Sequence, residues 1–134
     1  QMSELGYRTI AMHPYWASGW KRDVIYPLFG FDETYFLDDY FRDEWFTRSY
    51  VSDKGLFHAI EKKYDEKDED EPLFVFAVTM QNHSGYSKND YGNFTPQINV
   101  KGHEGNISLR MYMSLIRETD IAFRMIVNYF KIWR

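Results

Sequence analysis

The stretch Leu73-Phe74-Val75-Phe76-Ala77-Val78-Thr79-Met80-Gln81-Asn82-His83 indicates the fold of this chain more clearly than any other. Its first six residues are all apolar and rich in Val and Phe, which predicts a buried β-strand over residues 73–78. Polar residues follow and should end the strand. In open α/β sheets, ligands bind beyond the carboxyl ends of the strands. His83 is therefore a candidate functional residue if the sheet is parallel.

A second strand is expected over residues 7–12, and it too is followed by a histidine, His13. Ser18 can cap a helix that covers residues 20–29. Within that helix Pro27 should cause an end or a bend, because proline lacks the backbone N–H that continues the helix. This part of the chain is thus expected to run from strand through loop to helix.

The remaining segments continue the alternation of extended and helical structure. We expect an extended segment over residues 32–36, a helix over 54–64 that starts at Ser52-Asp53, and a long amphipathic helix over 107–133. Residues 84–106 should form a long loop with a short strand around Ile98 and Val100. This order favours an α/β fold with parallel strands. At most three strands leave open sheet edges, which indicates a piece of a larger domain.

Composition excludes several classes of function. The net charge is −4, and no basic cluster is present for phosphate neutralisation, so we expect no nucleic-acid partner. The chain has no cysteine, which excludes disulfides and thiolate chemistry. No run approaches the length and apolarity of a transmembrane helix. Aromatic residues make up 19% of the chain, which is compatible with a sugar or lipid-headgroup site.

Four residues are candidates for binding. If the two strands are parallel, His13 and His83 emerge at the same sheet edge, where two neutral imidazoles could bind a metal, hold a phosphate or transfer protons. Each could equally be a loop histidine bonded to backbone. Arg22 offers forked donors to an anion, and Trp20 offers an apolar face to a sugar or glycerol. No residue is a convincing nucleophile, so we predict no catalytic residue in this chain.

These residues resemble a known family. The segments Gly6-Tyr7-Arg8-Thr9, His13-Pro14-Tyr15, Trp20-Lys21-Arg22-Asp23 and Thr79-Met80-Gln81-Asn82-His83-Ser84-Gly85-Tyr86 are similar to the sulfatase-like phosphoglycerol transferases. These are enzymes of the lipoteichoic acid synthase type within the alkaline phosphatase superfamily. The resemblance runs in order along nearly the whole chain. It implies part of an alkaline-phosphatase/sulfatase-like sandwich, with a mostly parallel sheet flanked by helices.

The resemblance also implies a function. In that family a threonine attacks a phosphoglycerol headgroup beside a divalent metal, usually manganese. The positions of His13, Trp20, Arg22 and His83 match residues that line the substrate pocket. The family's nucleophile and metal ligands would lie before residue 1 and after residue 134. Residues 1–134 are therefore expected to be the central fragment of one catalytic domain, inactive alone and without a metal site.

For the parent protein, the resemblance implies a phospholipid or glycan headgroup substrate. It also implies membrane anchoring through segments outside this chain and an extracytoplasmic location at the cell envelope. A sulfatase or phosphodiesterase on the same scaffold is the second hypothesis, because sulfate and phosphate are both tetrahedral anions. A non-catalytic carbohydrate-binding module, which the aromatic content permits, is the third.

Overall fold

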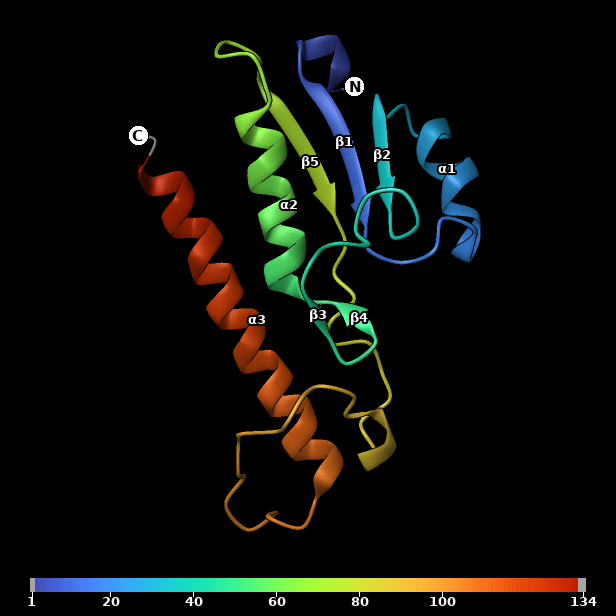
Figure 1. Ribbon diagram of the computed structural model, residues 1–134. Coiled ribbons are helices and arrows are strands. Elements are labelled where there is room, and N and C mark those ends of the chain that lie inside the picture. The colour runs from blue at the N-terminus through green and yellow to red at the C-terminus, as the bar shows by residue number, and fades with distance from the viewer. Residues whose placement is uncertain (1, 133–134) are drawn as a thin grey trace.

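A three-stranded parallel sheet organises the chain (Figure 1). The computed structural model describes residues 2–132. The strands are β1 (Arg8–His13), β2 (Glu33–Phe36) and β5 (Leu73–Ala77), in the order β2-β1-β5. Ile10 of β1 lies opposite Glu33 on one side and Val75 on the other. The predicted α/β fold with parallel strands is therefore confirmed.

Helices cover both faces of this sheet (Figure 1). On one face α1 (Arg22–Leu28) places Tyr26 against Ala11 and Phe36. On the other face α2 (Asp53–Asp65) packs Leu56 against the side chains of β1. The long helix α3 (Ile107–Ile132) lies outside α2, so this side has two helical layers. Alternating side chains of β1 thus contribute to two separate apolar clusters.

The structure corrects the expectation that residues 73–78 form a buried strand. β5 ends at Ala77 and is an edge strand whose residues are mostly half-buried, and Phe76 is 42% exposed. The buried strand is β1, where Ile10, Ala11 and Met12 are fully enclosed. β5 is the more apolar strand, but β1 has a hydrogen-bonded neighbour on each side, whereas β5 has one among the described strands.

The start of α2 follows the sequence prediction. Ser52 has extended backbone geometry, and its side chain accepts a hydrogen bond from the N–H of Gly55, as an N-cap should. A Cβ at position 55 would lie 2.9 Å from the carbonyl oxygen of Trp45, so this turn needs glycine. The predicted helix over 54–64 is therefore confirmed, with its first residue at Asp53.

The start of α1 differs from the prediction. Trp20 and Lys21 have φ angles of 58° and 53°, the left-handed region, so a short 3-10 helix (Gly19–Lys21) precedes α1 and the regular helix begins at Arg22. The Ser18 side chain makes no capping hydrogen bond. α1 ends at Leu28, one residue after Pro27, so the expected end of the helix at this proline is confirmed.

Two further differences concern short strands. A small antiparallel hairpin, β3 (Phe46–Thr47) and β4 (Tyr50–Val51), forms where no strand was predicted. Within the described part of the chain, the segment around Ile98 and Val100 is not a strand. The last helix reaches Ile132, and the predicted end at Trp133 lies outside the described residues.

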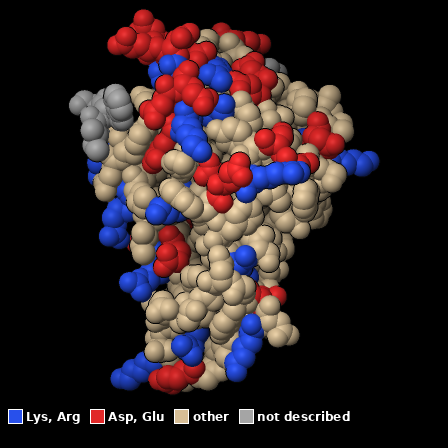
Figure 2. Space-filling model, viewed as in Figure 1, with Lys and Arg blue, Asp and Glu red and all other residues tan. Residues whose placement is uncertain are grey.

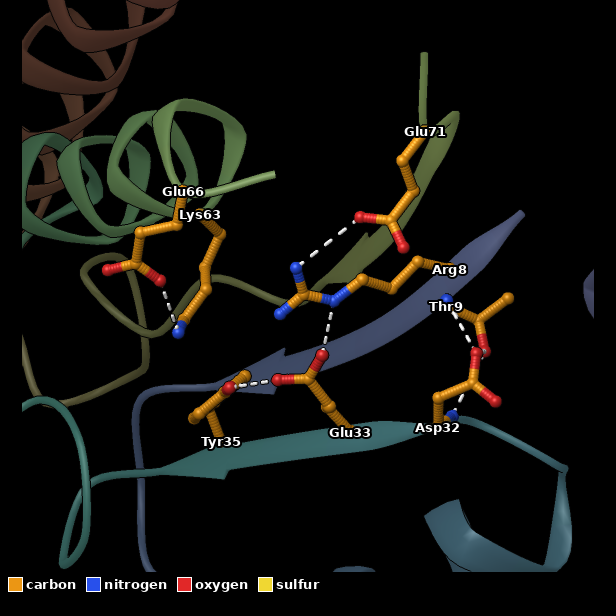
Figure 3. Close-up of polar contacts among 8 residues, drawn as sticks. All are labelled: Arg8, Thr9, Asp32, Glu33, Tyr35, Lys63, Glu66 and Glu71. Atoms are coloured by element: carbon orange, nitrogen blue, oxygen red, sulfur yellow. Dashed lines mark hydrogen bonds and ion pairs between the residues drawn. The ribbon is translucent and has the colours of Figure 1, made fainter. Parts of the chain in front are cut away.

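Charged side chains gather at the end of the sheet where β1 and β5 begin (Figure 3). Arg8 bonds to Glu33 of β2 and lies 3.6 Å from Glu71, the carboxylate just before β5. Asp32 accepts hydrogen bonds of 2.8 Å from both the N–H and the hydroxyl of Thr9. These bonds connect the starts of adjacent strands in register.

Residues 65–71, between the end of α2 and the start of β5, form an acidic run at this same end, which is rich in red side chains at the top of Figure 2. The strands run from this end toward the opposite one (Figure 1). Their carboxyl ends, and the polar residues that follow them, therefore lie away from the acidic run.

Candidate anion-binding site at the carboxyl ends of the strands

The two histidine-bearing segments leave the sheet at the same edge. His13 is the last residue of β1, and β5 ends opposite Met12. The N–H of Val78 still bonds to the carbonyl of Met12 at 3.0 Å, so the chain leaves β5 beside β1. The predicted placement of both segments at one edge follows from the parallel register.

His13 is buried, with 3% of its surface exposed. Its Nδ1 atom is buried and makes no hydrogen bond within residues 2–132. Burial, together with the positive charge of Arg22, lowers the pKa of His13 from 6.5 to about 4. At neutral pH its imidazole is therefore uncharged.

Arg22 and Trp20 are held by an unusual piece of backbone. Nη1 of Arg22 donates to the carbonyl of Gly19 at 2.8 Å and more weakly to that of Trp16 at 3.4 Å. A Cβ at Gly19 would lie 2.7 Å from Nη1, so glycine leaves room for the guanidinium. Trp20 is 87% exposed. The left-handed geometry of Trp20 and Lys21 costs free energy and directs a large apolar ring into solvent.

His83 is joined to the β1 side through two tyrosines. Its Nδ1 lies 3.2 Å from the hydroxyl of Tyr50, and the two ring centroids are 5.4 Å apart. Tyr50 also contacts Tyr15, two residues after His13, with centroids 6.1 Å apart. The hairpin β3–β4 therefore fills the space between the two predicted histidine segments. His83 itself is exposed.

Arg48 holds the loop that carries His83. Its Nη1 donates to the carbonyl of Gly85 at 2.6 Å, and its Nη2 donates to the carbonyls of Gln81 and His83, both at 2.8 Å. Arg48 is 8% exposed and sits at the hairpin turn with φ 60°. Arg48 was not among the residues that the sequence predicted for the site. A single arginine in an aromatic segment carries no local signal that its partners are 33 to 37 positions away.

A buried polar cluster fixes the other side of the same loop. Thr119 of α3 donates a 2.6 Å hydrogen bond to Oδ2 of Asp53 and accepts one from Asn82 at 2.8 Å. Gln81 accepts from the backbone N–H of Asp53 at 3.0 Å. Burial raises the pKa of the Asp53 carboxyl. The cluster links α2, α3 and the loop after β5.

The described residues do not fit a divalent metal. Within residues 2–132 no group of three or more His, Asp or Glu side chains comes together as ligands would. His83 contacts Tyr50, and the positive charge of Arg22 acts on His13; neither histidine lies beside a carboxylate in the contacts described. What the site offers is a cation, two imidazoles and an exposed indole, which suit an anion with an apolar substituent.

Within residues 2–132 no helix combines the length and apolar character that crossing a membrane requires. The long helix α3 carries exposed apolar side chains, among them Ile116 and Phe123, but charged residues interrupt the pattern.

Comparison with known proteins gives consistent results. The family model "Sulfatase" matches residues 1–132. A putative cyclic beta-1,2-glucan modification protein of Rhizobium meliloti is 30% identical over 133 residues, covering 94% of this chain and 19% of the relative. The capsular polysaccharide biosynthesis protein RkpI of the same organism is 23% identical over 128 residues, covering 96% of this chain and 22% of the relative. The chain thus spans about a fifth of these curated relatives.

Solved structures share the fold. The lipoteichoic acid synthase LtaP from Listeria monocytogenes superposes with a TM-score of 0.78 at 21% identity, over 97% of this chain and 31% of that one. The Streptococcus pyogenes phosphoglycerol transferase GacH, in complex with sn-glycerol-1-phosphate, gives 0.69 at 27% identity, over 93% and 33%. An alkaline phosphatase superfamily protein from Vibrio parahaemolyticus gives 0.62 at 21%, over 95% and 29%.

These likenesses confirm the resemblance and the fold class inferred from the sequence. The family model covers nearly every residue, and the neighbours share a parallel sheet flanked by helices. This chain belongs to the sulfatase family.

Proposed function

We propose that this chain is the substrate-binding portion of a metal-dependent phosphoglycerol transferase acting on lipid or glycan headgroups. The observation that carries the proposal is a buried, neutral His13 that experiences the positive charge of Arg22, together with the exposed ring of Trp20. The likeness to a phosphoglycerol transferase that binds sn-glycerol-1-phosphate supports this choice of substrate.

The side chains have distinct roles in this proposal. Arg22 uses Nη1 for backbone carbonyls, and within residues 2–132 its Nε and Nη2 make no hydrogen bond, so they are free to pair with phosphate oxygens. His13 and His83 donate N–H groups to the same anion, and Trp20 packs on the carbon chain of the glycerol. Four residues from three segments of the chain would then contact one headgroup.

We further propose that residues 1–134 are the central part of one sulfatase-like catalytic domain. The nucleophile and the ligands of a divalent metal, for which manganese is our expectation, would come from other parts of the polypeptide. We therefore expect this chain alone to be inactive. Turnover of a phosphodiester by the purified 134-residue chain with manganese would refute this.

For the whole protein we propose an extracytoplasmic site at the cell envelope, anchored to the membrane by other segments. No nucleic-acid partner is expected, because the net charge of −4 gives no basic field.

A sulfatase or phosphodiesterase is the second candidate, and the match to the sulfatase family model favours it. In that case water would replace the hydroxyl acceptor. The parallel α/β sheet argues against the third hypothesis, a carbohydrate-binding module, because such modules are mostly all-β.

The test uses the full-length protein with three substrates: a phosphoglycerol lipid with a glucan acceptor, the same lipid with water alone, and an aryl sulfate. Glycan-dependent transfer supports the transferase, whereas release into water or sulfate hydrolysis supports the second candidate. Arg22→Lys and Trp20→Ala should each lower kcat/KM at least tenfold on the true substrate. Arg42→Lys, on the exposed loop after β2, is the control and should leave kcat/KM unchanged.

A further inference from the structure

Tyr50 is placed to control the protonation pattern of the His83 imidazole. The only hydrogen bond that the His83 ring makes within residues 2–132 joins its Nδ1 to the Tyr50 hydroxyl at 3.2 Å. Nε2 makes none in that part of the chain, and the residue is exposed, so this nitrogen is available to a ligand. In a neutral imidazole one nitrogen donates and the other accepts. The Tyr50 contact at Nδ1 therefore influences whether Nε2 donates or accepts a hydrogen bond.

Two features make Tyr50 the donor in this pair. A phenol hydroxyl is a better hydrogen-bond donor than acceptor, and an unprotonated imidazole nitrogen is a good acceptor. The guanidinium carbon of Arg48 lies 5.3 Å from the centroid of the Tyr50 ring. A positive charge over the ring withdraws electron density and strengthens donation by the hydroxyl.

The geometry of the pair is fixed independently of any ligand. Arg48 also donates to the carbonyl of His83 at 2.8 Å, so one guanidinium holds the backbone of His83 and contacts the ring of Tyr50. The ring of Tyr15 also contacts the ring of Tyr50 and restricts the movement of Tyr50. The imidazole is thus bonded at Nδ1 before a substrate arrives.

We infer that Tyr50 is a positioning residue: it donates to Nδ1 of His83 and holds the neutral imidazole with its proton on Nε2, directed at the substrate anion. This inference rests on the proposed phosphate-binding role of His83 and deepens it. Without Tyr50, part of the population would carry the proton on Nδ1 and present a lone pair to a phosphate oxygen, which repels it.

The test is the tautomer itself, read by long-range 1H–15N correlation on protein labelled with 15N-histidine, at a pH above the ordinary pKa of histidine. The four histidines are assigned with a His83→Gln variant. In the wild type, Nδ1 of His83 should have the shift of an unprotonated nitrogen and Nε2 that of a protonated one. In Tyr50→Phe the ratio of Nδ1–H to Nε2–H tautomer should rise about fivefold, as expected for loss of a hydrogen bond worth ~1 kcal/mol. Tyr64→Phe, a tyrosine of α2 with ring contacts near the C-terminal end of α3, is the matched control and should change nothing.

A second arm separates this inference from the proposed function. Titration with sn-glycerol-1-phosphate should move the Nε2 resonance of the wild type, and Tyr50→Phe should need several-fold more ligand. In the full-length protein Tyr50→Phe should lower kcat/KM by about the same factor. An unchanged tautomer ratio in Tyr50→Phe overturns the inference, whatever the activity. A shifted ratio with Nε2 insensitive to the phosphate confirms the role of Tyr50 in tautomer selection and overturns phosphate binding by His83.

Discussion

Replacement of Arg48 by methionine should lower the free energy of unfolding and, at the same time, make the loop that carries His83 more mobile. Methionine keeps most of the length of the side chain but removes three donated hydrogen bonds, to the carbonyls of Gln81, His83 and Gly85. Charge-assisted hydrogen bonds are worth roughly 1.5 kcal/mol each at the low end, or about 4.5 kcal/mol for three. Removing a buried guanidinium also recovers part of its desolvation cost. We expect a net loss of about 3 kcal/mol in the free energy of unfolding.

The measurement is urea unfolding, combined with hydrogen exchange of the amides of residues 81–85. Arg48→Met should lower the urea midpoint, and these amides should exchange faster than those of β1. Arg42→Met is the matched control: Arg42 is exposed, so its replacement should change the unfolding free energy by less than about 0.5 kcal/mol. Arg48→Lys keeps the charge and should recover only part of the loss, because an ammonium cannot span three carbonyls in a fixed fork.

The reasoning fails if Arg48→Met unfolds at the same urea concentration as the wild type. It also fails if the variant is destabilised but residues 81–85 keep their exchange protection, because Arg48 would then stabilise the hairpin without holding the His83 loop.

Three further predictions follow from individual residues. The folded-state pKa of His13 is about 4, below the unfolded value of 6.5, so the folded protein binds fewer protons. Its contribution is therefore present above about pH 6.5 and is lost as the pH falls toward 4. The free energy of unfolding from urea curves, wild type minus His13→Gln, should fall by on the order of 3 kcal/mol over that window. Thr119→Val should lower the free energy of unfolding by about 2–4 kcal/mol, because it leaves Asp53 and Asn82 without their hydrogen-bond partner. The control Thr95→Val, at an exposed site, should lower it by less than about 0.5 kcal/mol; thermal unfolding of both variants is the measurement. Lys21→Gly should raise the free energy of unfolding by roughly 1 kcal/mol, since glycine adopts a φ of 53° without strain. A free energy of unfolding below that of the wild type would show that the Lys21 side chain makes a compensating contact.

Local sequence patterns predicted the elements of the fold well. The apolar run before Thr79, the helical spacing after Ser52 and the long amphipathic helix each form close to where they were expected. These patterns depend on neighbours within a few positions, and the periodicity of a strand or helix is a local property. Local sequence did not show which strand would be central: β5 is the more apolar strand, yet the sheet order gives β1 two partners.

The backbone before α1 shows a second limit. A serine followed by a helical pattern predicts an N-cap, yet Trp20 and Lys21 adopt left-handed geometry and delay the helix to Arg22. Residues other than glycine enter this region at a cost, and local propensity does not predict it. Such strain is common at functional sites, which fits the exposed position of Trp20.

The sequence by itself determined that the chain is α/β, that its strands are parallel, and that His13 and His83 follow strands whose carboxyl ends share an edge. Those conclusions need only periodicity and chain order. The tertiary structure decided what surrounds the two histidines: burial and Arg22 make His13 neutral, Tyr50 bonds to His83, and Arg48 fixes the loop. A pKa, a tautomer and a loop conformation depend on groups that are distant in sequence and adjacent only after folding, so no local pattern records them.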